Sequence, residues 1–198
     1  MKKQSGFSLL EVLISVVVLC FGVLGAVGLQ LTSLQANRES RLQATSVRLG
    51  EEIAELMRAN KNIAIKTVAA DNPYLTSTVN VTTDPACGYA ASSASCSTSA
   101  AVAQRDMYEW TQRVSKELPG AKVVICQDAT PYDSNGLPQW TCSDTGGVIV
   151  LKMGWTRANT LRGATGTDAT NTSTANTGAF DKALRPAIVL PLNPGSSE

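Results

Sequence analysis

The apolar run at residues 7–29 constrains this chain more than any other feature of its sequence. It holds 17 apolar residues among 23, and Glu11 is its only charge. A helix of 23 residues is about 34 Å long, enough to cross a bilayer core of about 30 Å. Lys2 and Lys3 precede the run, so the positive-inside rule predicts a single pass with the amino terminus in the cytoplasm.

Three interpretations of the apolar run compete. A secretory signal peptide has a shorter apolar region, of about 7–15 residues, and a small-x-small cleavage site, whereas this run continues into a helical pattern. A lipoprotein signal would end at Cys20, but Leu19 puts a bulky side chain where a small one is needed. The third interpretation is a short basic leader that is removed, leaving the run as a permanent anchor.

Residues 5–12 read Ser-Gly-Phe-Ser-Leu-Leu-Glu-Val, which resembles the prepilin peptidase motif of type IV pilins and type II secretion pseudopilins. The resemblance implies a leader at residues 1–6, cleavage between Gly6 and Phe7, and methylation of the new Phe7 amine. The implied partners are the prepilin peptidase, the pilus assembly platform, the inner membrane and other major and minor pilins. The implied final location is an extracellular pilus.

Glu11 is the candidate assembly residue. A carboxylate near the middle of an apolar span costs about 2.5–3.5 kcal/mol and is by default a functional candidate. Glu11 lies one turn from Phe7, where the helix dipole favours a negative charge. The resemblance implies that Glu11 meets the amino terminus of a neighbouring subunit during filament assembly. The alternative is a first-turn glutamate that snorkels to the lipid headgroups.

Gly22, Gly25 and Gly28 recur every three residues, and each weakens a helix by about 1 kcal/mol relative to alanine. One interpretation is close packing of small helix faces in the membrane. The other is a stretch that melts in the filament, although many pilins that do so carry a proline that this chain lacks.

The helical period continues beyond residue 29 and becomes amphipathic. We expect one helix over residues 8–70, with residues 7–29 in the membrane and residues 30–71 as its amphipathic continuation. On the polar side, Arg48 and Glu52 are spaced to pair across one turn. The apolar stripe is predicted to pack against a domain, with a coiled-coil partner as the alternative. Its members are spaced by seven: Leu42, Leu49, Leu56 and Ile63.

Residues 72–198 are predicted to form a globular head. A second helix is expected over residues 100–118, with Trp110 as a core anchor. Turn signals at 133–136 and 146–147 separate the predicted strands, which lie at 123–126, 139–142, 148–155 and 187–192, with a short strand suggested at 78–82. The resemblance implies an α+β fold, pilin-like, with a long N-terminal hydrophobic spine helix packed on an antiparallel sheet.

Two head segments carry almost no charge and are predicted as loops. Residues 86–103 contain no charged residue, and residues 163–180 contain one. The composition of the second segment predicts an exposed, mobile loop, interpreted either as a variable surface loop or as a site of glycosylation or partner binding.

Four of the five cysteines lie beyond the membrane, where an oxidising compartment allows disulfides. Four cysteines allow three connectivities, and we expect the local pairs Cys87–Cys96 and Cys126–Cys142. Zinc is the competing interpretation, but the spacing is not C-x-x-C and the chain has no histidine.

Composition excludes several function classes. The absence of histidine removes Ser-His-Asp and Cys-His catalysis, and a net charge of +1 argues against nucleic-acid binding. We expect no catalytic residues, no metal and no cofactor. Asp106 and Glu109 are predicted to be helix-dipole partners or part of a solvated face.

The head is similar to minor pilins of the PilV type, also called pilus modification proteins, in its Trp110 helix, its helix stop at Pro119-Gly120 and its strand ending at Trp155. The resemblance therefore implies a minor pilin that is incorporated into type IV pili and aids initiation of assembly and pilus-dependent adhesion and motility. Two alternatives stay open: a minor pseudopilin of a type II secretion system, and an uncleaved single-pass membrane-anchored binding module.

Overall fold

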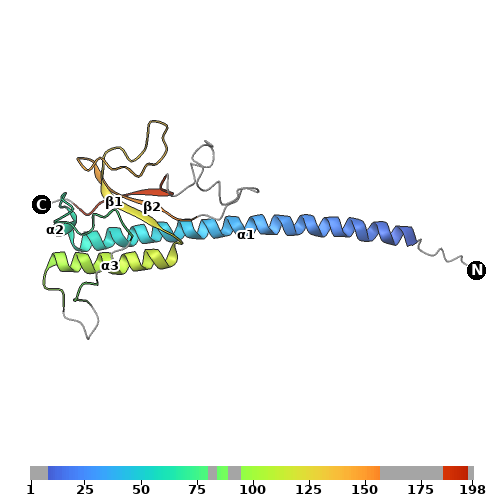
Figure 1. Cartoon of the computed structure of the whole chain (residues 1–198), viewed down its shortest axis with the longest axis horizontal. Helices are drawn as coiled ribbons and strands as arrows, with labels where there is room; N and C mark the ends of the chain where they lie inside the picture. The colour runs from blue at the N-terminus through green and yellow to red at the C-terminus, as the bar shows by residue number, and fades with distance from the viewer. Residues whose placement is uncertain (1–8, 80–83, 89–94, 157–184, 196–198) are drawn as a thin grey trace, which may run out of the picture. The chain divides into compact units, whose positions relative to one another are not determined.

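A computed structural model describes residues 9–79, 84–88, 95–156 and 185–195. The chain divides into two compact units, Met1–Ser40 and Arg41–Glu198, and helix α1 begins in the first and ends in the second. The elements in chain order are α1 (Leu9–Ala59), α2 (Lys61–Ala64), α3 (Ser99–Glu117), β1 (Lys122–Asp128), β2 (Val148–Gly154) and β3 (Ile188–Leu192) (Figure 1).

The described part of the first unit is the amino-terminal portion of α1. Its most apolar window has a mean hydropathy of 2.8 and is not buried at all within the chain. Among the described residues, α1 is the one helix whose length and composition suit it to crossing a membrane. The apolar run predicted from the sequence is therefore helical from Leu9 onward.

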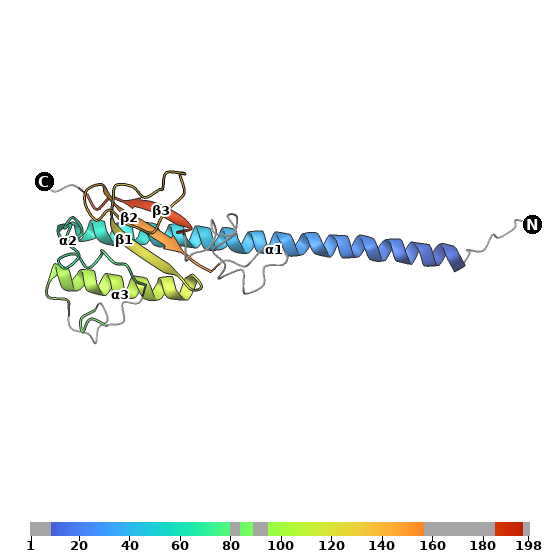
Figure 2. The same cartoon turned by 45° about the horizontal axis from the view of Figure 1, so that its top comes forward.

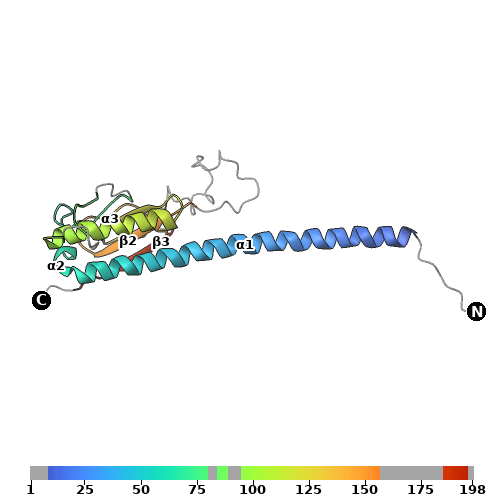
Figure 3. The same cartoon turned by 90° about the horizontal axis from the view of Figure 1, so that it is seen from below.

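The second unit is an α+β head, as predicted. Its three strands form an antiparallel sheet in the order β1-β2-β3, with Ile125 opposite Leu151 and Leu151 opposite Leu190. One face of the sheet packs on α3 and on the carboxyl-terminal part of α1, which run side by side (Figures 2 and 3). Large side chains from α1, α3 and the sheet are fully buried there, among them Leu49, Met57, Trp110, Ile125 and Leu151.

The predicted apolar stripe of α1 does pack against this domain. Leu49 is fully buried and Ile63, in α2, is 6 % exposed, while Leu42 and Leu56 are partly buried against the same core. The sheet lies close to the helix at Gly50, where an added Cβ would lie 2.5 Å from the Leu190 Cδ1.

Polar contacts join α1 to α3 in a pairing that differs from the prediction. Arg48 pairs with Glu117, and Glu52 pairs with Arg113, so the expected Arg48–Glu52 pair is wrong. The reason is that α3 lies alongside the polar flank of α1 and offers each residue an opposite charge. The buried Trp110 Nε1, on α3, donates to the Leu49 carbonyl, on α1, at 2.8 Å. This contact confirms Trp110 as a core anchor.

The predicted helix over residues 8–70 ends earlier than expected, at Ala59, and only the short α2 follows. The fully buried Asn72 explains why the helix does not resume. Its side-chain amide donates to the carbonyls of Ala64 and Lys66 at 3.0 and 2.8 Å. In a continuous helix these carbonyls would accept from backbone N–H groups four residues later.

Three predicted strands are confirmed as β1, β2 and β3, with slightly shifted ends. The strand predicted at 139–142 is wrong, because this segment makes no ladder and is held by a disulfide and side-chain contacts instead. At 78–82, the described residues Thr78 and Val79 lie in no strand, and the rest lies outside the described residues. The turn at 133–136 is confirmed by the Gly136 N–H donating to the Asp133 carbonyl at 2.9 Å.

The outer edge of β3 has reduced capacity to accept another strand. Thr76 and Ile125 exchange two backbone hydrogen bonds, so the N–H of Ile125 points away from β2. Because this direction alternates along a strand, the register turns Leu190 towards β2 and Pro191 towards the open edge. Proline has no N–H to donate there, which protects the edge from strand addition.

Candidate assembly site

Glu11 lies in the first turn of α1 and is exposed. The Ser15 hydroxyl donates to the Glu11 backbone carbonyl at 2.7 Å, so the Glu11 side chain is not used by that bond. The predicted processing residues Gly6 and Phe7 lie outside the described residues. Glu11 therefore lies at the described start of α1, ahead of a long uncharged stretch of that helix.

An uncharged surface follows Glu11 along α1. No charged residue occurs from Val12 to Asn37, and large apolar side chains from Leu9 to Leu34 are 43–83 % exposed. Isolated exposed apolar residues are ordinary, but a continuous surface of this kind requires lipid or other apolar helices as its surroundings.

The glycines at 22, 25 and 28 do not serve packing within the described chain. A Cβ added at Gly22, Gly25 or Gly28 would meet no other atom within 4 Å. Helix α1 is continuous through all three positions. Their small faces are consequently open on the surface of α1, and packing against neighbouring helices stays a prediction.

A long exposed apolar helix with an acidic first turn, leading into an α+β head, is a pilin-like arrangement whose helix suits membrane anchoring. Residues 1–27 match the family model of the prokaryotic N-terminal methylation motif, and residues 28–108 match that of type IV pilin Tt1218. The chain therefore carries the prepilin methylation motif, followed directly by a type IV pilin segment. No curated protein and no solved structure matches the chain.

Two disulfides tie the head together, and both agree with the prediction. Cys87 pairs with Cys96 and Cys126 pairs with Cys142, with Cα–Cα distances of 4.9 and 6.4 Å. Cys20 is free and exposed on the apolar part of α1.

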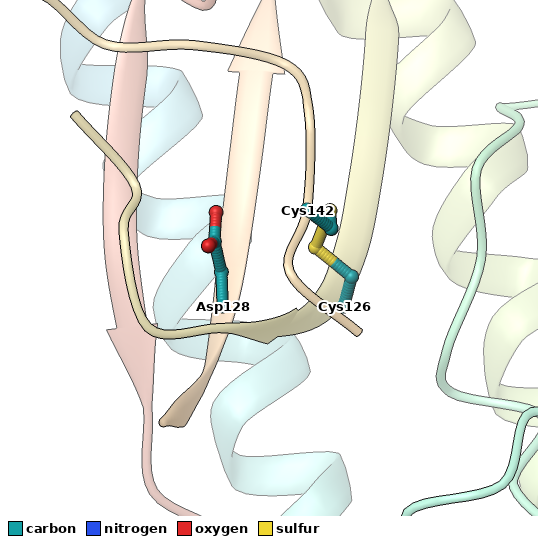
Figure 4. A group of neighbouring side chains, drawn as sticks. All are labelled: Cys126, Asp128 and Cys142. Atoms are coloured by element: carbon teal, nitrogen blue, oxygen red, sulfur yellow. A yellow bond between two sulfur atoms is a disulfide. The ribbon is translucent and has the colours of Figure 1, made fainter. Parts of the chain in front are cut away.

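Cys126, Cys142 and Asp128 form a group whose ligand atoms lie within 4.8 Å of one another (Figure 4). The composition of this group would suit a metal ion, but its chemistry does not. Both sulfurs are consumed in the disulfide, so neither is a thiolate. The Asp128 carboxylate already pairs with the Lys152 ammonium. We therefore assign this group a structural role.

The buried ion pair between Lys152 and Asp128 is a feature that the sequence reasoning missed. Both side chains are completely buried, and the Lys152 Nζ also donates to the Thr141 carbonyl at 2.7 Å. Burial by itself would raise the pKa of Asp128, but hydrogen bonds from Lys152 and the Thr130 N–H outweigh it and lower that pKa. The sequence did carry a signal for this pair, because Lys152 lies within the otherwise apolar strand Val148–Gly154.

The sequence predicts Asp106 to be a helix-dipole partner or part of a solvated face, and the structure corrects both, since α3 has no acidic residue in its first turn and Asp106 is buried. It is 6 % exposed and accepts a hydrogen bond from the Tyr74 hydroxyl at 2.7 Å. Burial raises its pKa, although the Tyr74 hydrogen bond acts in the opposite direction. Glu109 does lie at the surface, where it pairs with Arg105. The hydroxyl of Tyr74, 3.3 Å from the Leu56 carbonyl, links α1 to Asp106 on α3.

Proposed function

We propose that the chain is a minor pilin, incorporated into type IV pili, that aids initiation of assembly and pilus-dependent adhesion and motility. The observation that carries this proposal is the exposed, uncharged stretch of α1 after Glu11, preceded by a methylation motif and followed by a folded head. The proposed partners are other major and minor pilins, the prepilin peptidase and the assembly platform.

The proposed mechanism begins in the inner membrane, with the amino terminus in the cytoplasm. Cleavage after Gly6 and methylation of Phe7 leave an apolar helix that begins close to Glu11. Transfer of this helix from lipid into a bundle of equivalent helices keeps its apolar surface away from water. The assembled subunit then presents its head on the extracellular pilus.

Glu11 is proposed to favour incorporation of the helix into the bundle by pairing with a charge on a neighbouring subunit. A carboxylate is costly in an apolar bundle unless an opposite charge accompanies it. The amino group of a neighbouring mature subunit supplies that charge at the same helix end. Pairing therefore favours incorporation over random contact between apolar helices.

The decisive experiment deletes the gene for the chain and compares surface piliation with protein secretion in the same strain. We expect loss of piliation and adhesion, restored by the wild-type chain, with secretion unchanged. Loss of secretion with normal piliation would assign the chain to a type II secretion system instead.

Mass spectrometry of the amino terminus adds an independent check. We expect a mature chain that begins at N-methylated Phe7. Functional protein that retains Met1 would contradict both filament assignments and leave an uncleaved membrane-anchored module.

A further inference from the structure

We propose that the Cys126–Cys142 disulfide is a redox latch on the outer face of the sheet. Closed, it holds the segment between β1 and β2 over the Lys152–Asp128 pair. Reduction releases this cover and exposes Lys152 to water, while the inner core between the sheet and the helices stays folded. This inference concerns the head and does not depend on the proposed filament role.

The latch and the ion pair lie on the same face of the sheet. Cys126 and Asp128 are two residues apart on β1, so their side chains point to one side of the strand. Figure 4 shows the disulfide and the Asp128 carboxylate together on the side of the sheet turned away from the helix behind it. The inner face carries the main core instead, with Ile125, Leu151 and Met153 fully or almost fully buried.

The cover, residues 129–147, is attached by side-chain contacts as well as by the disulfide. The Lys122 ammonium lies 4.3 Å from the Trp140 ring centroid, and the Arg185 guanidinium pairs with Asp133 at 2.7 Å. Hydrogen bonds join it to the charged pair and to the end of β1. The Lys152 Nζ donates to the Thr141 carbonyl at 2.7 Å, the Thr130 N–H donates to the Asp128 carboxylate at 2.9 Å, and the Asp144 N–H donates to the Gln127 carbonyl at 3.1 Å. A backbone hydrogen bond from Ser143 also reaches the Asp128 carboxylate. Trp140 and Cys142 add a small apolar contact with Val150 and its neighbours.

The cover lacks regular structure to hold it in place. Between β1 and β2, the described chain contains one isolated bridge, Tyr132 to Pro138, and no helix or strand. The covalent link at Cys142 is therefore the strongest single attachment of the cover. Without it, the loop regains conformational freedom that the closed state forbids.

The ion pair supplies a reason for the cover to open. A buried ammonium is tolerated only when it is paired and hydrogen-bonded, because burial removes its solvation by water. If the Thr141 carbonyl leaves with the cover, Lys152 loses one of its two hydrogen-bond partners and gains solvation by opening. An apolar side chain at position 152 would gain no solvation when the cover opens.

The redox step is a thiol–disulfide exchange. A dithiol reductant gives two electrons, its thiolate attacks the partly exposed Cys142 sulfur, and a second attack releases the mixed disulfide. The products are two cysteine thiols and the oxidised reductant. Closure reverses this balance and requires a disulfide oxidant, such as a thiol–disulfide oxidoreductase or oxidised glutathione.

Amine labelling of the full-length chain in detergent tests the latch. An N-hydroxysuccinimide acetate labels accessible lysines, and mass spectrometry reads Lys152 against the exposed Lys116 as an internal reference. In a Cys126→Ser/Cys142→Ser variant we expect Lys152 labelling to rise about ten-fold or more, because local opening becomes frequent. The matched Cys87→Ser/Cys96→Ser variant should keep Lys152 protected.

Amide hydrogen exchange in α3 separates local opening from unfolding. We expect residues around Trp110 to keep their exchange protection when Lys152 becomes reactive. Three results would overturn the latch: Lys152 still protected in the Cys126→Ser/Cys142→Ser variant, equal labelling in both disulfide variants, or loss of α3 protection together with Lys152 exposure. If that variant does not fold, titration of the Cys87→Ser/Cys96→Ser chain with dithiothreitol reduces only Cys126–Cys142, and Lys152 labelling and α3 protection are read in the same way.

Discussion

At the scale of single residues, the head depends on positions where backbone geometry or burial leaves little choice. Gly146 and Gly147 form the predicted turn before β2, and both have positive φ, 70° and 76°. Only Gly147 also lies against the main chain, because an added Cβ would be 2.6 Å from the Asp128 carbonyl oxygen. A comparison of substitutions at Gly146 and Gly147 therefore distinguishes the cost of positive φ from the cost of a backbone clash.

Gly147→Ala is expected to lower the free energy of unfolding of the head by about 2–4 kcal/mol, through strain at positive φ together with the backbone clash. Gly146→Ala, which meets no atom within 4 Å, is the matched control and should cost about 1–2 kcal/mol. Denaturant unfolding measures both. Equal losses would show that the contact with Asp128 has no energetic effect.

Asp106 is expected to make the head more stable in acid. Because its pKa is raised in the folded protein, the folded state holds the proton longer than the unfolded state. The contribution is present below its usual pKa of 3.8 and is lost as pH rises from there through the folded-state pKa.

Asp106→Asn should remove this pH dependence and raise stability at neutral pH, because the amide oxygen still accepts from Tyr74. The surface variant Glu51→Gln, whose exposed carboxylate is not among the groups that shift the Asp106 pKa, is the control and should keep the dependence. Thermal unfolding across a pH series measures both. An unchanged pH profile in Asp106→Asn would assign the dependence to another group.

At the scale of elements, packing on α1 decides where the sheet can lie. The seven-residue stripe indicated which side of the helix is buried, and Leu49 and Ile53 confirm it. The stripe did not indicate that a strand would cross at Gly50. That crossing depends on β3, which is distant in sequence and reaches the helix through Leu190.

Gly50→Leu is expected to destabilise the head by about 1–3 kcal/mol, because the larger side chain forces Leu190 and Leu151 away from the helix. Gly28→Leu is the matched control, since its Cβ would meet no atom within 4 Å. Unfolding followed by near-ultraviolet circular dichroism should report a loss for the first variant only. A similar loss in both would point to helix propensity or membrane effects instead of packing.

At the scale of the whole molecule, the two units have different requirements. The amino-terminal unit presents an apolar surface that needs lipid or other helices, whereas the head has its own core and two disulfides. A change at Glu11 should therefore affect assembly without affecting the folding of the head.

Glu11→Ala is expected to leave leader cleavage largely intact but to lower the fraction of the chain found in sheared filaments. The physical reason is the loss of the charge proposed to meet a neighbouring amino terminus. Immunoblots of membrane and filament fractions measure both steps, and Ser15→Ala on the same helix is the control. Normal incorporation of Glu11→Ala would remove the role proposed for this residue.

The sequence by itself determined the features that depend on local pattern. The apolar run, its single charge, the second helix, three strands and both disulfide pairs follow from periodicity, turn residues and local spacing, and the pilin-like plan follows from the motif at residues 5–12. These properties were predictable because near neighbours in the chain produce them.

Only the tertiary structure decided the features that join distant segments. Asn72 keeps the helix from resuming after α2 by donating to the carbonyls of Ala64 and Lys66, and α3 redirects Arg48 to Glu117. Burial of Asp106 and of the Lys152–Asp128 pair likewise depends on contacts across 24 or more residues. Local pattern indicates which side chains are polar, but their solvation depends on which remote segments cover them.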